Sequence, residues 1–326
     1  MPKPFRILSI DGGGIRGIVP ALVLADLEAR TGQRVSDLFD LVAGTSTGGV
    51  LALALTRDDP VPADKLVSLY GREGRSIFSK SFWRRLPGYA LMDERYSDKG
   101  LVRVLKKYLG ESSLAEASPP VLVTSYALER RMPFFFKSAK AKASGTKASH
   151  DFPMWQVGRA TSAAPTYFEP YKLEASGEGY YSLVDGGVFA NNPAMCALAE
   201  AMGEGVAPSD IVMLSLGTGE HTRPIPHKDA VNWGLANWAV PIIGIMMDGV
   251  SDTVHYQVSK ILGKGSYLRV QGKLTDAMDD MDDASRANIR ALRRFAKGLV
   301  REYAEDLEAL ALRLNSPGAA EKAAGA

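Results

Sequence analysis

The sequence predicts an α/β fold in which helices cover both faces of a mainly parallel central sheet, giving a three-layer αβα sandwich. Short apolar runs alternate with helical patterns at residues 6–10, 19–30, 38–43 and 47–56. Such βαβα alternation is typical of parallel sheets. Two glycine-rich segments, 11–17 and 44–48, each lie between an apolar run and a helical pattern, which is where the strand-to-helix turns of α/β proteins occur.

The rest of the chain continues this alternation. We expect further strands at 121–127, 132–136, 180–184, 211–216 and 267–270, with helices near 155–163 and 194–202. From residue 283 to residue 314, apolar positions recur every three or four residues, which predicts one long amphipathic helix. We expect this helix to pack on the sheet.

Composition shifts sharply at two places only. The stretch 137–149 is rich in Lys, Ala and Ser, and we expect a solvated loop there. The segment 315–326 is rich in Ala, and we expect a disordered tail. The remaining residues, 1–314, are predicted to form a single domain, since 326 residues can form one large α/β domain.

Bulk properties narrow the functional class. The formal net charge is only +2, so no global attraction to a nucleic acid polymer is expected. The single cysteine, Cys196, cannot form an intrachain disulfide, which suits a reducing compartment. No secretory signal is visible, and no apolar stretch approaches the roughly 20 residues that span a bilayer. We therefore expect a cytoplasmic protein that contacts membrane surfaces only transiently.

The first glycine-rich segment has the sequence DGGGIRG, from Asp11 to Gly17. Three consecutive glycines leave backbone amides unobstructed, and amides at a helix N-terminus favour an anion. From the residues alone, this turn can serve a nucleotide phosphate, serve a developing oxyanion, or simply connect a strand to a helix.

The second segment, Gly44-Thr45-Ser46-Thr47-Gly48, has the G-x-S-x-G pattern. In this pattern a serine sits on a sharp turn between a strand and a helix, and small neighbours allow its hydroxyl to be presented at the tip of the sheet. The helix dipole favours negative charge nearby. The segment therefore predicts a nucleophilic serine at position 46, in preference to a glycine-rich turn with an incidental serine.

A serine hydroxyl needs a base to accept its proton. None of the four histidines (150, 221, 227 and 255) lies in a recognisable triad context. Asp185 closes an apolar strand and is followed by Gly186 and Gly187, so it is a candidate general base. The alternative role for an isolated Asp-Gly is a turn or a helix cap.

The order DGGGIRG, GTSTG and DGG resembles that of the patatin-like phospholipases, which are lipid acyl hydrolases with a Ser-Asp dyad. The similarity extends to ATSAAPTYFEP, VDGGVFANNP, VMLSLGTGE, YLRVQ and MDDAS, over about residues 5–300, and points to the plant patatin branch and its bacterial relatives. The implied fold is the patatin-like form of the αβα sandwich.

The resemblance implies that Ser46 attacks an ester carbonyl and that Asp185 accepts its proton, without a metal or a cofactor. It implies four further roles: an oxyanion hole of Gly12, Gly13 and Gly14; a supporting loop with Arg16 and Gly17; elbow glycines Gly44 and Gly48; and a turn at Gly186 and Gly187.

The implied substrate is a glycerophospholipid or another lipid ester, cleaved as by a phospholipase A or a lysophospholipase. Two stretches are candidates for membrane contact, 77–96 and 233–250. The alternative for both is ordinary core or lid packing, which is slightly favoured for the second. Some bacterial members with which the chain shares similarity are antiphage effectors gated by a cyclic oligonucleotide, so a small-molecule activator is an alternative.

A nonenzymatic nucleotide-binding protein is a further alternative. It is disfavoured because no acidic residue ends a second strand about 20 residues after the glycines. A peptidase or a thioesterase with the same dyad remains open, since the same nucleophile serves any acyl transfer.

Overall fold

The computed structural model describes residues 4–78, 96–144, 150–175, 179–220, 223–238, 241–278 and 280–315. Its eight-stranded sheet contains β1 (Phe5–Ile10), β2 (Leu41–Thr45), β3 (Val121–Ala127), β4 (Met132–Lys137), β5 (Tyr171–Ala175), β6 (Gly179–Asp185), β7 (Ile211–Leu216) and β8 (Tyr267–Val270).

The helices before the fifth strand are α1 (Ile18–Thr31), α2 (Val35–Leu38), α3 (Thr47–Thr56), α4 (Ala63–Ser68), α5 (Gly74–Ile77), α6 (Lys99–Leu109), α7 (Ser138–Ala143) and α8 (Met154–Thr161). The later helices are α9 (Gly187–Ala190), α10 (Ala194–Gly203), α11 (His227–Ala230), α12 (Leu235–Trp238), α13 (Pro241–Leu262), α14 (Arg286–Glu302) and α15 (Ala304–Asn315). Short 3-10 turns are η1 (Gly14–Gly17), η4 (Leu114–Glu116) and η5 (Pro208–Asp210), and η2 (Leu69–Glu73) is π-helical.

The strand order is β5-β6-β3-β2-β1-β7-β8, with β4 also paired to β3. Strands β3, β2, β1, β7 and β8 are parallel neighbours. Strands β4 and β6 run antiparallel to β3, and β5 runs antiparallel to β6. The prediction of a mainly parallel sheet is therefore confirmed, with an antiparallel extension at one end.

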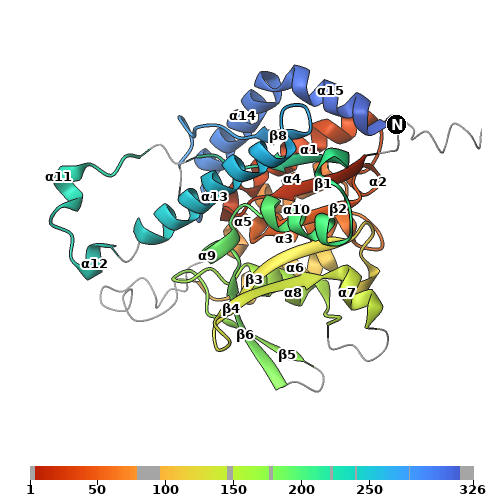
Figure 1. The fold of residues 1–326 in the computed structure, drawn as a ribbon. Helices are drawn as coiled ribbons and strands as arrows, with labels where there is room; N and C mark the ends of the chain where they lie inside the picture. Colours follow the sequence, from red (N-terminus) through yellow and green to blue (C-terminus); the bar gives the residue numbers. More distant parts are fainter. Residues whose placement is uncertain are drawn as a thin grey trace, which may run out of the picture.

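Helices lie on both faces of this sheet (Figure 1), as predicted. The side chains of Leu8 and Ile10 belong to the apolar core under α1, α3 and α14, while Ile7 belongs to the core under α10 and the C-terminal part of α13. This alternation follows from the two-residue period of a strand. Because both faces are covered, every residue of β2 and every residue of β1 after Phe5 is buried, and most of them are apolar, as expected for parallel strands inside a fold.

The single long helix predicted at 283–314 is wrong, because the structure has two helices that meet at Tyr303. Tyr303 leaves the helical conformation (φ −95°, ψ 18°), and its hydroxyl donates to the carbonyl of Gln271 at 3.0 Å. The apolar positions keep their three- or four-residue spacing across this break, so the periodicity alone did not reveal it. Both helices still contribute buried side chains, such as Leu292 and Leu307, to the core that contains Leu8 and Ile10.

The loop predicted at 137–149 is partly helical. Helix α7 forms because Ser138 and Ala141 are buried, and the Ser138 hydroxyl accepts a hydrogen bond from the Val121 amide at 2.8 Å. Residues 145–149 lie outside the described residues. The predicted tail also lies outside them except for Asn315, which ends α15. The single-domain organisation stays a prediction.

Across the described ranges, the structure has no helix that is both long and apolar enough to cross a membrane. Most of the aromatic and basic stretch at 77–96 lies outside these ranges.

Candidate active site

The sheet brings the two predicted catalytic residues together through strand β3. Strand β4 pairs along β3 from Leu122 to Ala127 and so occupies one of its edges. Strands β2 and β6 must share the other edge. Because β2 is parallel and β6 antiparallel to β3, they run towards each other, and their last residues meet where Thr45 pairs with Thr124 and Asp185 pairs with Ser125. Ser46 follows directly after β2.

This convergence differs in its geometry from that of an all-parallel sheet. The carboxyl ends of parallel strands deliver the residues that follow them to one common edge. The glycine loop after β1 and the serine after β2 follow that rule, since Ile10 pairs with Gly44. Asp185 instead arrives from the opposite direction on an antiparallel strand.

Ser46 has the conformation of a strained turn. Its φ of 54° and ψ of −122° fall in a region that residues with a side chain rarely adopt, which costs on the order of 1–3 kcal/mol. The surroundings hold it there. The Ser46 amide donates to the hydroxyl of Thr161 at 2.8 Å, that hydroxyl donates to the carbonyl of Thr124 at 2.7 Å, and the Ser46 carbonyl accepts from Val50.

The elbow glycines are required by close backbone approach. A Cβ on Gly44 would lie 2.3 Å from the Gly48 carbonyl oxygen, and a Cβ on Gly48 would lie 2.1 Å from that of Ile10. Gly17 has the same function at the neighbouring turn, because a Cβ there would lie 2.2 Å from the Thr47 hydroxyl. Small residues at these positions therefore let α3 begin immediately against β1 and η1.

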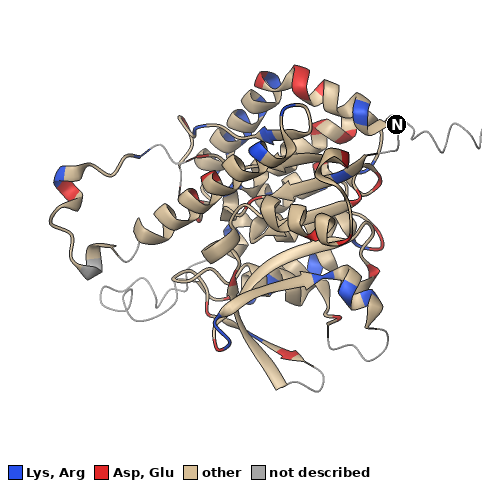
Figure 2. Ribbon diagram, viewed as in Figure 1, with Lys and Arg blue, Asp and Glu red and all other residues tan. Residues whose placement is uncertain are grey.

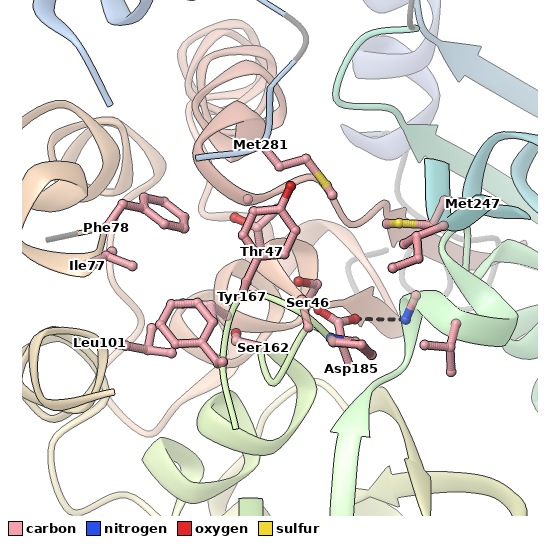
Figure 3. A pocket seen from close by; sticks show the side chains of 18 of the residues that line it. Ser46, Thr47, Ile77, Phe78, Leu101, Ser162, Tyr167, Asp185, Met247 and Met281 are labelled. Atoms are coloured by element: carbon pink, nitrogen blue, oxygen red, sulfur yellow. Dashed lines mark hydrogen bonds between the residues drawn. The ribbon is translucent and has the colours of Figure 1, made fainter. Parts of the chain in front are cut away.

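Asp185 is a buried carboxylate, only 3% exposed. Its Oδ1 accepts the Gly187 amide at 2.7 Å, and its side chain lies beside Ser46 (Figure 3). Burial raises the pKa of Asp185 to about 7, while hydrogen bonding with the Ser46 hydroxyl and the Gly187 amide opposes this rise. Within the described chain, no salt bridge compensates its charge. A Cβ on Gly186 would lie 2.1 Å from the Thr124 hydroxyl, so glycine is needed at this turn too.

The glycine loop offers two backbone donors. The amides of Gly13 and Gly14 have no acceptor among the described residues, and Gly14 and Ser46 both line the same cavity. Gly14 has a φ of 58°, and a Cβ there would lie 2.2 Å from the Met281 carbonyl oxygen, so only glycine fits. The assignment of Gly12 needs revision, because its amide already donates to the Asn191 carbonyl at 3.0 Å. A Cβ built on Gly12 would lie 3.3 Å from the Cβ of Ser46. Glycine at this position therefore allows the loop to approach Ser46 closely.

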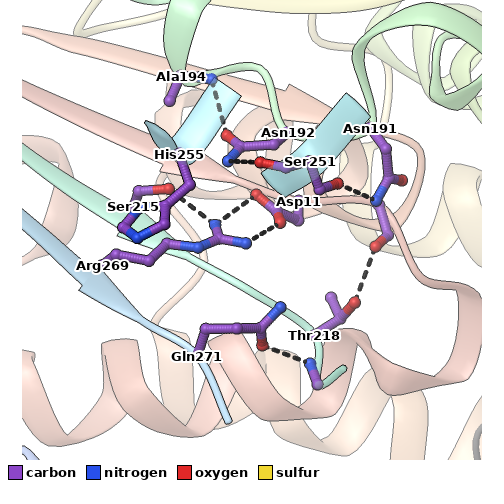
Figure 4. A network of polar contacts seen from close by, with 12 residues as sticks. Asp11, Asn191, Asn192, Ala194, Ser215, Thr218, Ser251, His255, Arg269 and Gln271 are labelled. Carbon is purple, nitrogen blue, oxygen red and sulfur yellow. Dashed lines mark hydrogen bonds and ion pairs between the residues drawn. The ribbon is translucent and has the colours of Figure 1, made fainter. Parts of the chain in front are cut away.

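A buried ion pair anchors this loop (Figure 4). The guanidinium of Arg269, on β8, donates to both carboxylate oxygens of Asp11, at 2.9 Å and 2.5 Å, and to the Ser215 hydroxyl at 2.8 Å. The Thr218 hydroxyl donates to the Gly12 carbonyl at 2.8 Å. Sequence reasoning gave none of these contacts a function, although Arg269 lies in the YLRVQ segment that carried part of the resemblance.

Arg16 is buried and donates to two backbone carbonyls, that of Gly13 at 3.4 Å and that of Gly219 at 3.3 Å. These contacts fit the supporting role predicted for it. The residue as a whole is only 4% exposed.

Ser46 and Asp185 line an apolar cavity of about 120 Å³ (Figure 3). Its walls come from helices on both sides of these two residues and from the segment after α8. They include Val50, Leu69, Ile77, Phe78, Leu101, Val104, Leu105, Pro165, Tyr167, Phe168, Ile243, Met246, Met247 and Met281. Among the residues that the structure describes, the walls carry no charged side chain apart from Asp185, so the cavity suits an aliphatic chain.

No histidine lines this cavity among the residues that the structure describes. His255 instead lies near the ion pair of Asp11 and Arg269, and its Nδ1 is 3.2 Å from the Tyr267 hydroxyl. The same ranges contain no cluster of acidic, His or Cys side chains that could hold a metal ion. The groups available for acyl transfer are thus a strained serine, a carboxylate of raised pKa and two unpaired amides.

The sequence model of the family described as "Patatin-like phospholipase" matches residues 8–198, a range that contains the glycine loop, Ser46 and Asp185. The chain belongs to this family. It is 31% identical to Patatin-like protein 2 of Oryza sativa subsp. indica, over 91% of this chain and 84% of that protein. It is 33% identical to Patatin-15 of Solanum tuberosum, over 91% of this chain and 83% of that protein.

The crystal structure of VipD from Legionella pneumophila is also similar, with a TM-score of 0.43 and 13% sequence identity, over 91% of this chain and 67% of that chain. Membership of the patatin-like phospholipase family supports a lipid acyl hydrolase activity for this chain.

Proposed function

We propose that this chain is a serine lipid acyl hydrolase that cleaves fatty acyl esters of glycerophospholipids through Ser46 and Asp185. The observation that carries the proposal is the junction on β3, where a strained serine meets a buried carboxylate whose pKa is about 7. This pair opens directly into an apolar cavity. Family membership supports the same class of reaction.

In the acylation step, the Ser46 oxygen attacks the ester carbonyl while Asp185 takes the hydroxyl proton. A pKa near 7 leaves much of the carboxylate ionised at neutral pH and makes it a stronger base than an ordinary aspartate. The tetrahedral oxyanion accepts hydrogen bonds from the Gly13 and Gly14 amides. Collapse breaks the ester bond, and the proton on Asp185 passes to the departing alkoxide, which leaves as an alcohol.

In the deacylation step, water attacks the acyl-Ser46 ester and Asp185 accepts its proton. The second tetrahedral intermediate then releases a fatty acid and returns the proton to the Ser46 oxygen. Both half-reactions use the same base and the same two amides, as covalent catalysis requires.

The substrate assignment rests on the cavity walls. An aliphatic chain matches their apolar side chains, and burying each methylene contributes about 0.8 kcal/mol. A polar headgroup is not matched by these walls and would remain outside. A long-chain ester is therefore favoured over a peptide, whose amide groups would lose hydrogen bonds to water inside the cavity.

The test is release of free fatty acid from mixed phospholipid vesicles by wild type, Ser46→Ala and Asp185→Asn, each checked for folding. We expect both variants to lose activity by at least a thousandfold. Ser162→Ala is the matched control, since this serine lines the cavity outside the elbow, and it should keep most of the activity. Loss with Ser162→Ala and retention with Ser46→Ala would overturn the assignment. Addition of cyclic oligonucleotides to a silent wild type tests for gating.

A further inference from the structure

The segment after α11 is poor in charged residues. No charged residue occurs between Asp229 and Asp248, and Figure 2 shows the first turns of α13 without charged positions. The described part of this segment, residues 231–238 and 241–247, is called the apolar arm below. It contains Trp233 and Trp238, whose rings meet edge to face with centroids 5.2 Å apart.

One side of the apolar arm faces away from the protein. Trp238 is 37% exposed, Ile242 44%, Ile245 43% and Met246 50%. Figure 1 shows α12 and the start of α13 projecting from the body of the fold. Ordinary packing therefore covers only part of this stretch, because these four large apolar side chains remain exposed to solvent.

The other side of the same turns belongs to the catalytic cavity. Ile243 and Met247 line it together with Ser46 and Asp185. Met246, which is half exposed, also lines the cavity and so belongs to both sides. The Met247 methyl group is close to the Asp185 turn, since a Cβ on Gly187 would lie 3.1 Å from it. The exposed apolar surface is thus continuous with the walls of the cavity.

The far half of α13 is fixed to the catalytic junction. The Ser251 hydroxyl accepts a hydrogen bond from Asn191 at 3.1 Å, and its carbonyl accepts one from Asn192 at 3.5 Å (Figure 4). The Asn191 carbonyl in turn holds the Gly12 amide. These contacts fix the position of α13 relative to Ser46. A membrane or other surface that binds the first turns of α13 is therefore also fixed relative to Ser46.

We propose that the apolar arm is the surface on which this protein docks to a lipid bilayer. The inference rests on the proposed function and specifies how its substrate arrives. Trp side chains favour the boundary between headgroups and acyl chains, and an uncharged apolar helix end inserts shallowly there. Docking in this orientation places the cavity walls against the bilayer, so an acyl chain passes from lipid to cavity without crossing water.

Because the arm carries no basic side chain, the attraction is hydrophobic. Binding to vesicles of zwitterionic phosphatidylcholine should be nearly as strong as binding to vesicles that contain anionic phosphatidylglycerol, and should change little with salt.

The test is flotation of Ser46→Ala protein with phosphatidylcholine vesicles, so that binding is measured without hydrolysis. Ile242→Glu and Ile245→Glu, added to that protein, should each weaken partitioning by about tenfold. Neither residue lines the cavity, and Glu near a helix N-terminus favours the helix. Leu312→Glu on α15 is the matched control, because Leu312 is 64% exposed at a remote site, and it should bind as the parent does. Equal binding by all variants would overturn the proposal.

Kinetics separate this proposal from the proposed function. In the active protein, Ile242→Glu should lower hydrolysis of vesicle phospholipid but leave hydrolysis of a soluble short-chain ester unchanged. If the substituted protein still hydrolyses vesicle phospholipid at the wild-type rate, the proposed docking surface is overturned and the catalytic assignment is unaffected. Binding to vesicles by a protein inactive on every ester would support the docking surface and overturn the function. A soluble protein partner that covers the arm, with no vesicle binding, would also overturn docking.

Discussion

Replacing Asp185 with Asn should make the protein more stable at neutral pH while removing its activity. The two side chains have almost the same shape, and the Asn oxygen can still accept the Gly187 amide. What changes is the cost of holding a buried carboxylate, which raises the pKa of Asp185 from an ordinary 3.8 to about 7 in the folded state. Catalysis thus uses a group that destabilises the fold.

The magnitude follows from proton linkage. Below pH 4 both the folded and the unfolded chain hold the Asp185 proton, so the carboxyl adds no penalty. Between pH 4 and pH 7 the unfolded chain has lost the proton and the folded chain retains it. Wild type therefore loses about 1.4 kcal/mol per pH unit relative to Asp185→Asn. Above pH 7 both states are ionised, and the difference levels off on the order of 4 kcal/mol.

The assay is urea unfolding of both proteins at pH 4, 5.5, 7 and 8.5, followed by fluorescence and circular dichroism to check that the transitions coincide. Asp229→Asn is the control, because it changes a carboxylate that is exposed on α11. Its difference from wild type should stay small at every pH. A flat difference for Asp185→Asn, or one that falls as pH rises, would refute the account of a buried and uncompensated carboxylate.

Three further predictions concern the groups around the dyad. With a soluble ester, kcat/KM should rise with pH through one apparent pKa near 7 and then stay level, because Asp185 must be ionised to act as a base; a profile that falls across this range would contradict that assignment. Arg269→Gln should lower the free energy of unfolding by about 3–5 kcal/mol, since it leaves the buried Asp11 unpaired. Urea unfolding checks this, and an unchanged midpoint would show that the pair contributes little. Thr161→Val should cost about 1–3 kcal/mol and reduce kcat more than it changes KM, because the Ser46 amide loses its acceptor. Thr161→Ser should restore both quantities.

The local parts of the site were predictable because short-range sequence determines them. Gly44 and Gly48 around Ser46 specify a turn that only small residues allow, and an apolar strand and helix flank it. The same holds for Gly14, whose positive φ follows from a tight turn before a helix. Each of these features needs only a few neighbouring residues, so its pattern is present in the sequence itself.

Features that depend on long-range pairing were not predictable. Asp185 reaches the site on an antiparallel strand because of the register between β3 and β6. No pattern in the residues near Asp185 indicates that register. The hydrogen bond from the Gly12 amide depends on the position that the Asn191 carbonyl takes in the folded chain. The exposure of Ile242 and Ile245 likewise depends on α13 extending beyond the sheet, because an apolar run has the same composition whether it is buried or not.

The most direct test of the central claim is covalent labelling with a fluorophosphonate, followed by intact mass and peptide mapping. The account predicts a single adduct on Ser46 in wild type, no adduct in Ser46→Ala, and a labelling rate that falls by at least a hundredfold in Asp185→Asn, while Ser162→Ala is labelled as wild type is. An adduct on any other residue, or labelling of Ser46 at the full rate without the Asp185 carboxylate, would contradict the proposed dyad.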